Sequence, residues 1–269
     1  MNPSLDDLST AQAWLQSLHP LPTAVVEELR HRYEVSLTHH STAIEGNTLT
    51  KSETQIVIEK GITIGGKSLT EHLEVIGHKE ALDFVLEVVS GDSQFTEREI
   101  REIHSLVMKG QANGDNGKYR NLDVKAAGTD YVYPAYLKVP DLMTQFMEWL
   151  NYPSDLHPVE FASEANARFV TVHPFRDGNG RVGRLLLNLI LLRSGYPITV
   201  LEVGQRSEYI DALEAFQSEN SRIALDSLIT HAVSKSLRDT LTTALSSSSI
   251  HLKDSEKQTM LTWLDEHKW

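Results

Sequence analysis

The feature that most restricts the fold of this chain is an apolar run from Leu185 to Leu192, interrupted only by Asn188. The run lies in a segment, Gly180 to Ser194, that is long enough for a helix of about four turns. Such a helix is apolar nearly all round, so it must lie at the centre of a domain with other elements packed around it. The apolar run is far too short to span a bilayer.

The segments around this helix show the apolar period of amphipathic helices, and capping-box patterns at Thr50–Glu53 and Thr96–Glu99 mark the start of two of them. Residues 113–140 differ. They contain glycine, proline and a β-leaning run at Tyr131–Tyr133, which predicts a loop with a small hairpin. The expected fold class is all-α, a helical bundle with a small β-hairpin flap. We expect helices at 24–44, a short one from 51, then 70–89, 97 to near 110, 140–151, 158–172, 180–194, 207–219, 225–245 and 255–267.

Composition excludes several classes of function. The 269 residues include no cysteine, which rules out disulfides, zinc–thiolate sites and cysteine nucleophiles. Lysine and arginine number 25 against 37 aspartate and glutamate, and the resulting formal net charge of −12 disfavours binding to nucleic-acid phosphates. The first residues lack the pattern of a secretory signal. We expect a cytoplasmic protein with neither nucleic acid nor a membrane as partner.

The segment before the central helix combines the parts of a phosphate site. Gly178 and Gly180 allow the backbone to approach a ligand, and the start of the helix presents free N–H groups and a positive dipole end. Arg181 and Arg184 are expected in the first turn of this helix. A cation at the positive end of the helix dipole costs ~0.3–1 kcal/mol unless an anion binds beside it. Asp177 beside a phosphate site is a natural ligand for Mg²⁺.

His173 lies just upstream, and the ordinary pKa of a histidine suits a general base at neutral pH. Each part of this segment alone has a common structural explanation. A histidine before a proline is usually structural, an aspartate before a glycine usually forms a turn, and two arginines on one helix usually form surface ion pairs. Their joint occurrence ahead of a buried helix favours a site for a polyanionic ligand beside a base.

The run from His173 to Arg184 resembles the signature of the Fic family, His-x-Phe-x-Asp/Glu-Gly-Asn-Gly-Arg-x-x-Arg, at every fixed position. The resemblance extends from about Thr38 to about Leu228 and is especially close to the metazoan AMP-transferring members. It implies three parts: an N-terminal helical segment that includes an inhibitory helix (1–50), a Fic catalytic domain (51–245) and a C-terminal helix (246–269).

The resemblance implies a protein adenylyltransferase, which transfers AMP from Mg-ATP to a Ser, Thr or Tyr hydroxyl of a target protein. His173 would deprotonate that hydroxyl, Asp177 would hold Mg²⁺, and Arg184 would pair with the γ-phosphate. Tyr209 matches a nucleotide-pocket tyrosine of similar proteins, and Gln217 stands where relatives have asparagine. The nucleotide-binding residues implied by the motif are Asp177, Gly178, Asn179, Gly180, Arg181, Val182, Gly183 and Arg184.

Ser41-x-x-x-Glu45-Gly46 resembles the family's inhibitory pattern, which assigns a regulatory role to Ser41 and Glu45. The two residues lie four apart and share a helix face. Glu45 lies in a last helical turn, where the dipole disfavours an anion, just as it disfavours Arg184 at the start of its own helix. If the fold brings Glu45 and Arg184 together, each relieves the other, and the arginine that the γ-phosphate needs is occupied.

The resemblance also implies partners: a target protein docked on a flap near 121–133 by strand addition, and a second copy in a homodimer. Three alternatives stay open. In some relatives the inhibitory glutamate orients a water that removes AMP, so the chain could be deAMPylating. It could use another phosphate-containing donor, although the inhibitory pattern and Arg184 favour ATP. It could also be a Fic-derived ATP-binding regulatory module, against which His173 and Asp177 both argue.

Overall fold

The computed structural model describes residues 3–91, 94–110, 114–125, 129, 131–152 and 154–267. Within these ranges the chain forms α-helices and two 3-10 helices and no strand, which confirms the all-α class. The elements are α1 (Leu5–Ser17), α2 (Thr23–Ile44), α3 (Lys51–Lys60), α4 (Leu69–Val89), α5 (Glu97–Val107), η1 (Tyr136–Lys138), α6 (Val139–Leu150), α7 (Pro158–Val172), α8 (Asn179–Arg193), η2 (Val203–Gln205), α9 (Arg206–Glu219), α10 (Ile223–Ser246) and α11 (Asp254–Glu266).

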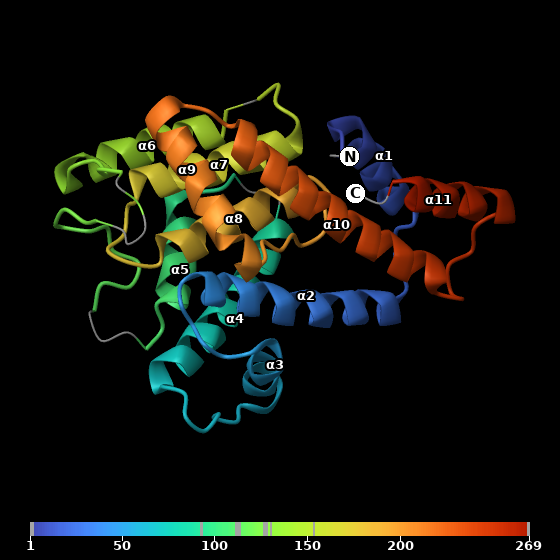
Figure 1. The fold of residues 1–269 in the computed structure, drawn as a ribbon, viewed down its shortest axis with the longest axis horizontal. Coiled ribbons are helices and arrows are strands. Elements are labelled where there is room, and N and C mark those ends of the chain that lie inside the picture. The colour runs from blue at the N-terminus through green and yellow to red at the C-terminus, as the bar shows by residue number, and fades with distance from the viewer. Residues whose placement is uncertain are drawn as a thin grey trace.

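Helix α8 is the central helix that its apolar sequence predicts, and the other helices surround it (Figure 1). It packs against α7, α4, α5 and α2. Leu185, Leu186 and Leu191 are completely buried. Because α8 is enclosed along its length, its first turn is held rigidly, and this turn is where the sequence predicts a phosphate site.

The N-terminal helix α1 was not given separate bounds by the sequence. Its start is fixed by a capping box, in which the Asp7 N–H donates to Ser4 Oγ and the Ser4 N–H donates to the Asp7 carboxylate. Leu8, Ala11 and Leu15 form its buried stripe. This stripe is narrow because most other positions in α1 are polar, so the apolar period is weak. The helix packs on α10, at the end of the molecule where both termini lie (Figure 1).

The prediction of a small hairpin around Tyr131–Tyr133 is wrong for the described residues, because 131–135 adopt no regular structure. Residues 126–128 and 130 lie outside the described part. An arginine side chain takes the place of a strand ladder here. The Arg120 guanidinium is buried and donates to the backbone carbonyls of Leu122 and Pro134, which lie on the two limbs of the segment. These two backbone carbonyls are therefore bonded to a side chain and not to a partner strand.

One hydrophobic core extends from α1 to α11 and includes Leu8, Leu185 and Leu264. A smaller cluster, formed by Leu49, Val57 and Val75, joins α3 to α4. In the portion of the chain that the structure describes, no helix combines the length and the apolar character needed to cross a membrane.

Candidate active site

The loop between α7 and α8 is shaped by its own sequence. Helix α7 ends at Val172, its C-cap His173 adopts the left-handed conformation with φ of 50°, and Gly178 (φ 78°) forms the N-cap of α8. Phe175 between them is completely buried. The Asn179 side chain clasps the backbone of Phe175, since its Oδ1 accepts from the N–H at 2.9 Å and its Nδ2 donates to the carbonyl at 2.9 Å. The side chain of Asn179 therefore holds the loop, and only its backbone remains for a phosphate.

Arg120 ties the same loop to the segment before it. Its Nε donates to the His173 carbonyl at 2.8 Å, and its backbone N–H donates to the Pro174 carbonyl at 2.9 Å. A single buried side chain thus links the His173 backbone to the irregular segment that the sequence identified as a flap. Sequence reasoning did not single out Arg120.

The imidazole of His173 is held in one tautomer by a backbone carbonyl. Its Nδ1 lies 3.2 Å from the Val170 carbonyl, which can only accept, so Nδ1 carries the proton. Nε2 is then an acceptor, and it has no hydrogen bond within the described residues. Burial lowers the pKa of His173 to about 4, against the opposing effect of the bond to Val170. The ring packs on Tyr133 with centroids 3.9 Å apart, which fixes its direction.

The first turn of α8 presents backbone donors. The first intrahelical bond runs from the Val182 N–H to the Gly178 carbonyl, so the N–H groups of Asn179, Gly180 and Arg181 have no acceptor within the helix. Glycine at 180 is required by what lies against it: a Cβ built there would be 2.3 Å from Glu45 Oε1. The Glu45 carboxylate therefore lies against the N-terminal end of α8.

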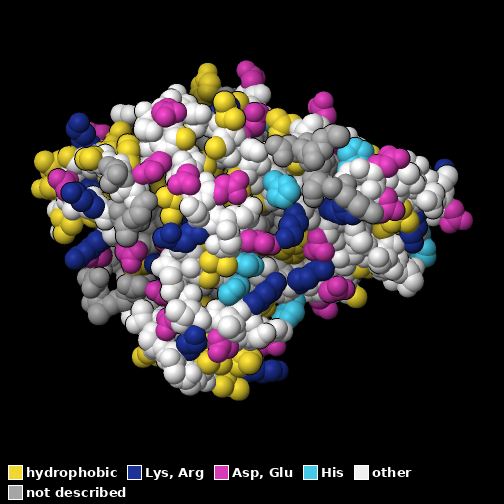
Figure 2. All heavy atoms as spheres, viewed as in Figure 1, with side chains coloured by type: hydrophobic (Ala, Val, Ile, Leu, Met, Phe, Trp, Pro, Cys, Tyr) yellow, Lys and Arg dark blue, Asp and Glu magenta, His cyan; other side chains and the backbone are white. Residues whose placement is uncertain are grey.

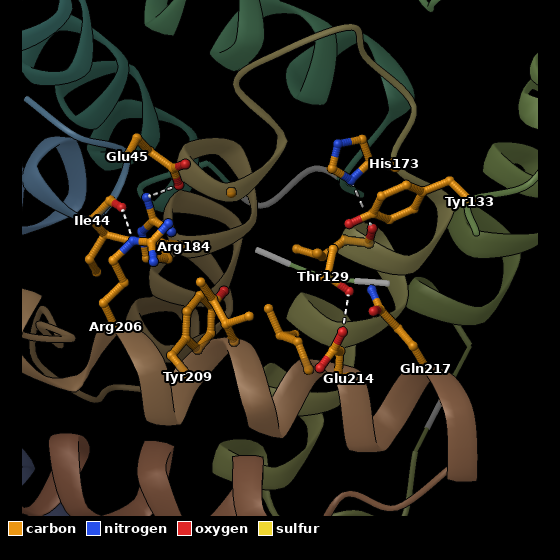
Figure 3. A pocket seen from close by; sticks show the side chains of 14 residues that line it. Ile44, Glu45, Thr129, Tyr133, His173, Arg184, Arg206, Tyr209, Glu214 and Gln217 are labelled. Carbon is orange, nitrogen blue, oxygen red and sulfur yellow. Dashed lines mark hydrogen bonds and ion pairs between the residues drawn. The ribbon is translucent and has the colours of Figure 1, made fainter. Parts of the chain in front are cut away.

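Arg184, in the second turn of α8, connects this helix to α2. Its Nη2 donates to Glu45 Oε1 at 2.7 Å and to the Ser41 carbonyl at 2.7 Å, and its Nε donates to Ser41 Oγ at 3.1 Å. The side chain of Arg184 is 3% exposed and that of Glu45 is 39% exposed. The structure thus brings together Ser41, Glu45 and Arg184, which the sequence linked by pattern and by charge. Figure 3 shows the pair of Glu45 and Arg184.

The Glu45 carboxylate is held in its charged form. Desolvation raises the pKa of Glu45, but the guanidinium of Arg184, together with the charges of Arg181 and Arg206, outweighs it and leaves the pKa below its ordinary value. Arg206 also caps α2, because its Nε donates to the Ile44 carbonyl at 2.7 Å. Sequence reasoning assigned no separate role to Arg206, because the carbonyl that it caps lies 162 positions away in the chain.

Arg181 and Asp177 lie on the other side of the helix start. Arg181 is buried, with its Nη2 3.6 Å from Asp177 Oδ1 and its Nη1 3.9 Å from Glu74 Oε1. Its Nε is buried without a hydrogen-bond partner among the described residues. The Asp177 side chain is 62% exposed and accepts from the Gly178 N–H at 2.6 Å. The guanidinium is only partly satisfied, and the carboxylate faces solvent.

A pocket extends from this charged end past His173 to α9 (Figure 3). Tyr209 and Gln217 both line it, as the resemblance predicts for a nucleotide pocket. The Tyr209 hydroxyl donates to Asn166 Oδ1 at 2.9 Å, and the Arg184 guanidinium lies 5.9 Å from the Tyr209 ring centroid. The lining residues are Ile44, Glu45, Thr129, Tyr133, Val170, His173, Gly180, Arg184, Arg206, Tyr209, Ile210, Leu213, Glu214 and Gln217.

Two motif residues lie away from this pocket. Val182 is completely buried in the core. A Cβ at Gly183 would meet Asn166 Nδ2 at 2.9 Å and Val170 at 3.1 Å, so this glycine allows α7 to pack closely on α8. The contacts that the structure shows for Val182 and Gly183 are those of helix packing, and a nucleotide contact by either residue stays a prediction of the motif.

Sequence reasoning missed the contact between Thr129 and Glu214, two residues that line the pocket. Thr129 Oγ1 donates to Glu214 Oε1 at 2.5 Å and accepts from the Tyr131 N–H at 3.1 Å, which links the predicted flap to α9. A threonine and a glutamate 85 positions apart carry no signal of this contact. Tyr133 was noted only for its β propensity. The remainder of the predicted target-docking stretch includes 126–128 and 130, which lie outside the described residues.

The comparisons with known proteins agree with this geometry. The sequence model of the Fic/DOC family matches residues 94–191. The chain is 34% identical over 212 residues to a protein adenylyltransferase Fic of Drosophila willistoni, a match that covers 78% of this chain and 42% of that protein. It is 40% identical over 178 residues to the protein of the same name from Nematostella vectensis, a match that covers 65% of this chain and 41% of that protein.

Solved structures show the same fold. A fragment of Fic-1 from C. elegans superposes with a TM-score of 0.80 at 31% identity, over 88% of this chain and 71% of that chain. A Fic domain-containing signaling protein from Bacteroides thetaiotaomicron superposes with a TM-score of 0.82 at 26% identity, over 91% of this chain and 98% of that chain. The chain spans only about two fifths of the length of the two adenylyltransferases.

Proposed function

Because this chain belongs to the Fic family, we propose that it is a protein adenylyltransferase that moves AMP from Mg-ATP to a Ser, Thr or Tyr hydroxyl of a target protein. The observation that supports this most strongly is the placement of His173. The His173 ring lines the same pocket as Gly180 and Arg184, at the N-terminal end of α8, and its Nε2 carries no proton. A base beside a phosphate site is what AMP transfer to a hydroxyl requires.

In the proposed reaction, the proton of the target hydroxyl moves to Nε2 of His173. The oxygen forms a bond to the α-phosphorus, and the bond from that phosphorus to the bridging oxygen of the pyrophosphate breaks. Pyrophosphate leaves with the electron pair. The proton held on His173 then returns to solvent. The low pKa of His173 favours its neutral form before the reaction, when a base must be free.

The N–H groups at the start of α8 and the Arg184 guanidinium would bind the phosphates of ATP. A polyanion at this position is favoured by the helix dipole and would also satisfy the partly unpaired Arg181. These groups are fixed before the substrate arrives, because Arg181 and Arg184 are buried and the loop is clasped by Asn179. Preorganised donors of this kind stabilise developing negative charge without the cost of reorganisation.

Asp177 would hold Mg²⁺, and its surroundings fit this ion. The carboxylate is largely exposed at the edge of the loop, and its Oδ1 is oriented by the Gly178 N–H. Magnesium usually takes one or two carboxylates and completes its shell with water and phosphate oxygens. When bound, the ion would neutralise phosphate charge.

Glu45 would inhibit the reaction by its position. Its carboxylate pairs with Arg184 and lies against Gly180, so it occupies the end of α8 that a terminal phosphate needs. Any nucleotide that enters must displace it or bind in another pose. AMP transfer then depends on whatever moves α2 away from α8.

A second activity is supported by the same residue. Glu45 is ionised and partly exposed, and it lines one pocket with His173, so it could orient a water molecule for removal of AMP from a modified target. The test is loss of label from a purified AMP-modified substrate. Removal by the wild type, and none by Glu45→Gln, is the expected result. Equal removal by both would exclude this role.

The proposed partners are a target protein bound along residues 121–133 and a second copy of the chain. Apolar side chains support the homodimer, since Ile56, Ile62 and Leu69 are 40–69% exposed where α3 leads into α4 (Figure 2). If this patch forms the interface, Leu69→Lys lowers the mass measured by sedimentation, whereas Ile223→Lys at the exposed start of α10 does not. A cytoplasmic location stays a prediction from the sequence.

The proposed transfer is tested by the part of ATP that reaches protein. Glu45→Gly enzyme is incubated with Mg²⁺, cell lysate and ATP labelled at either the α- or the γ-phosphate. AMP transfer predicts protein-bound label from the α-phosphate that depends on His173. Label from the γ-phosphate alone would indicate a kinase-like donor use, and label from neither would contradict the proposal.

A further inference from the structure

His104 lies outside the motif, on α5, directly beneath the loop that joins α7 to α8. It is 2% exposed. Neither the motif nor the pocket includes it, yet it contacts both the loop and the segment 114–120.

Both ring nitrogens of His104 are engaged by backbone groups. The Gly117 N–H donates to Nδ1 at 2.9 Å, so Nδ1 carries no proton. Nε2 lies 3.1 Å from the Asp177 carbonyl and therefore carries the proton that it donates. Only the neutral Nε2–H tautomer satisfies both partners. Burial lowers the pKa of His104 to about 4, which agrees with a neutral ring.

The ring face also supports the loop. His104 stacks on Phe175 with centroids 3.6 Å apart and planes 6° from parallel. A Cβ at Gly178 would lie 3.4 Å from His104 Cδ2 and 2.8 Å from Met108 Sδ. The peptide between Asp177 and Gly178 thus rests on α5, with its carbonyl held by His104.

This peptide fixes the position of two parts of the proposed site, the Asp177 carboxylate and the N-cap of α8. Its carbonyl belongs to Asp177, and its N–H belongs to Gly178, which bonds Asp177 Oδ1. A rotation of the peptide would move the carboxylate and the N-cap of α8 together. The other loop contacts, from Arg120 and Asn179, hold His173, Pro174 and Phe175 but not this peptide.

We propose that His104 is a positioning residue for the proposed AMP transfer: its Nε2–H fixes the Asp177–Gly178 peptide and so aims the Asp177 carboxylate and the first turn of α8 at the nucleotide phosphates. The inference rests on the proposed function for its kinetic consequence. The placement of the loop itself does not depend on that function.

The first test measures loop order without catalysis, by amide hydrogen exchange over residues 173–180. His104→Phe keeps a stacking ring but loses both hydrogen bonds, and we expect roughly 2- to 12-fold faster exchange, the range that one net hydrogen bond confers. His104→Gln places an amide donor near the position of Nε2 and should restore most of the protection. His104→Asn reaches only the Gly117 side and should not.

His72→Phe is the matched control. His72 is also buried on a helix, and its two nitrogens also bond backbone groups, at Ile64 and Ser68, but it lies on α4 in the smaller core cluster region. It should lower the melting temperature about as much as His104→Phe and leave exchange at 173–180 unchanged. Equal loop exchange in both phenylalanine variants would overturn the proposal.

The second test uses the Glu45→Gly background, where transfer is expected to be measurable. His104→Phe should lower kcat by about 10- to 100-fold, since small displacements of positioned groups have effects of this size. His104→Gln should recover most of kcat. An unchanged kcat in a folded His104→Phe enzyme would contradict the proposal. If Glu45→Gly itself transfers nothing, the proposed function fails, and the exchange measurement still decides the role of His104.

Discussion

Glu45 Oε1 lies 2.7 Å from the Arg184 guanidinium, which joins the C-cap of α2 to the second turn of α8. The anion is unfavourable at the C-terminal end of its helix, and the cation beside it offsets that penalty. The contact therefore engages groups that ATP would use in the proposed reaction. It gives the proposed inhibition a physical basis whose strength single substitutions should adjust.

Ser41→Ala should weaken the inhibitory contact without abolishing it. The Ser41 hydroxyl accepts from Arg184 Nε, but the Ser41 carbonyl and Glu45 both remain as acceptors. Loss of one hydrogen bond is worth about 0.5–1.5 kcal/mol, so basal AMP transfer should rise severalfold and remain well below that of Glu45→Gly. The rate of α-phosphate labelling measures this. No rise above the wild-type rate would show that the hydroxyl does not restrain Arg184.

The effect of Gly180→Ala on the free energy of unfolding should change sign with the residue at position 45. In the wild type the new Cβ would meet Glu45 Oε1 at 2.3 Å, so the substitution should lower the free energy of unfolding. In Glu45→Gly this obstacle is gone, and alanine in place of glycine in a helix stabilises by up to about 1 kcal/mol. Urea unfolding of the four proteins in this cycle gives the coupling free energy. Identical effects in both backgrounds would mean that the carboxylate does not lie against Gly180.

The pH dependence of AMP transfer should reflect the low pKa of His173. The base must be neutral, and burial lowers its pKa to about 4, so the base is available above that pH and is lost as the pH falls through it. Glu45 raises the pKa of His173, so Glu45→Gly should not move this midpoint upward. Single-turnover rates at saturating Mg-ATP, with folding checked by circular dichroism, should stay level down to about pH 5.5. A midpoint near the ordinary histidine pKa of ~6.5 would contradict a desolvated base.

The sequence predicted those parts of the molecule that depend on strong local patterns. The apolar residues of α8 could only form a buried helix, and the predicted and observed bounds of α2 agree to within one residue at its start. The pairing of Glu45 with Arg184 was foreseen because each charge opposes its own helix dipole. A charge that opposes its helix dipole is visible in the sequence, and it predicts an opposite charge nearby in the fold.

The parts that were missed depend on tertiary contacts between ordinary residues. Thr129 bonds Glu214, and His104 bonds Asp177, across 85 and 73 positions, and none of these residues is unusual in its local sequence. The expected hairpin failed for a similar reason. The bonds that take the place of its ladder come from the buried Arg120, which donates to carbonyls 2 and 14 positions away that no periodicity reveals.

The most direct test of the account compares protein-bound α-phosphate label in the wild type, Glu45→Gly and Glu45→Gly/His173→Ala under identical Mg-ATP and lysate. The account predicts little label in the wild type, strong label in Glu45→Gly, and a return to background when His173 is also replaced. Nucleotide binding should persist in all three. Equal labelling of wild type and Glu45→Gly would contradict inhibition by Glu45, and undiminished labelling of the double variant would contradict His173 as the base.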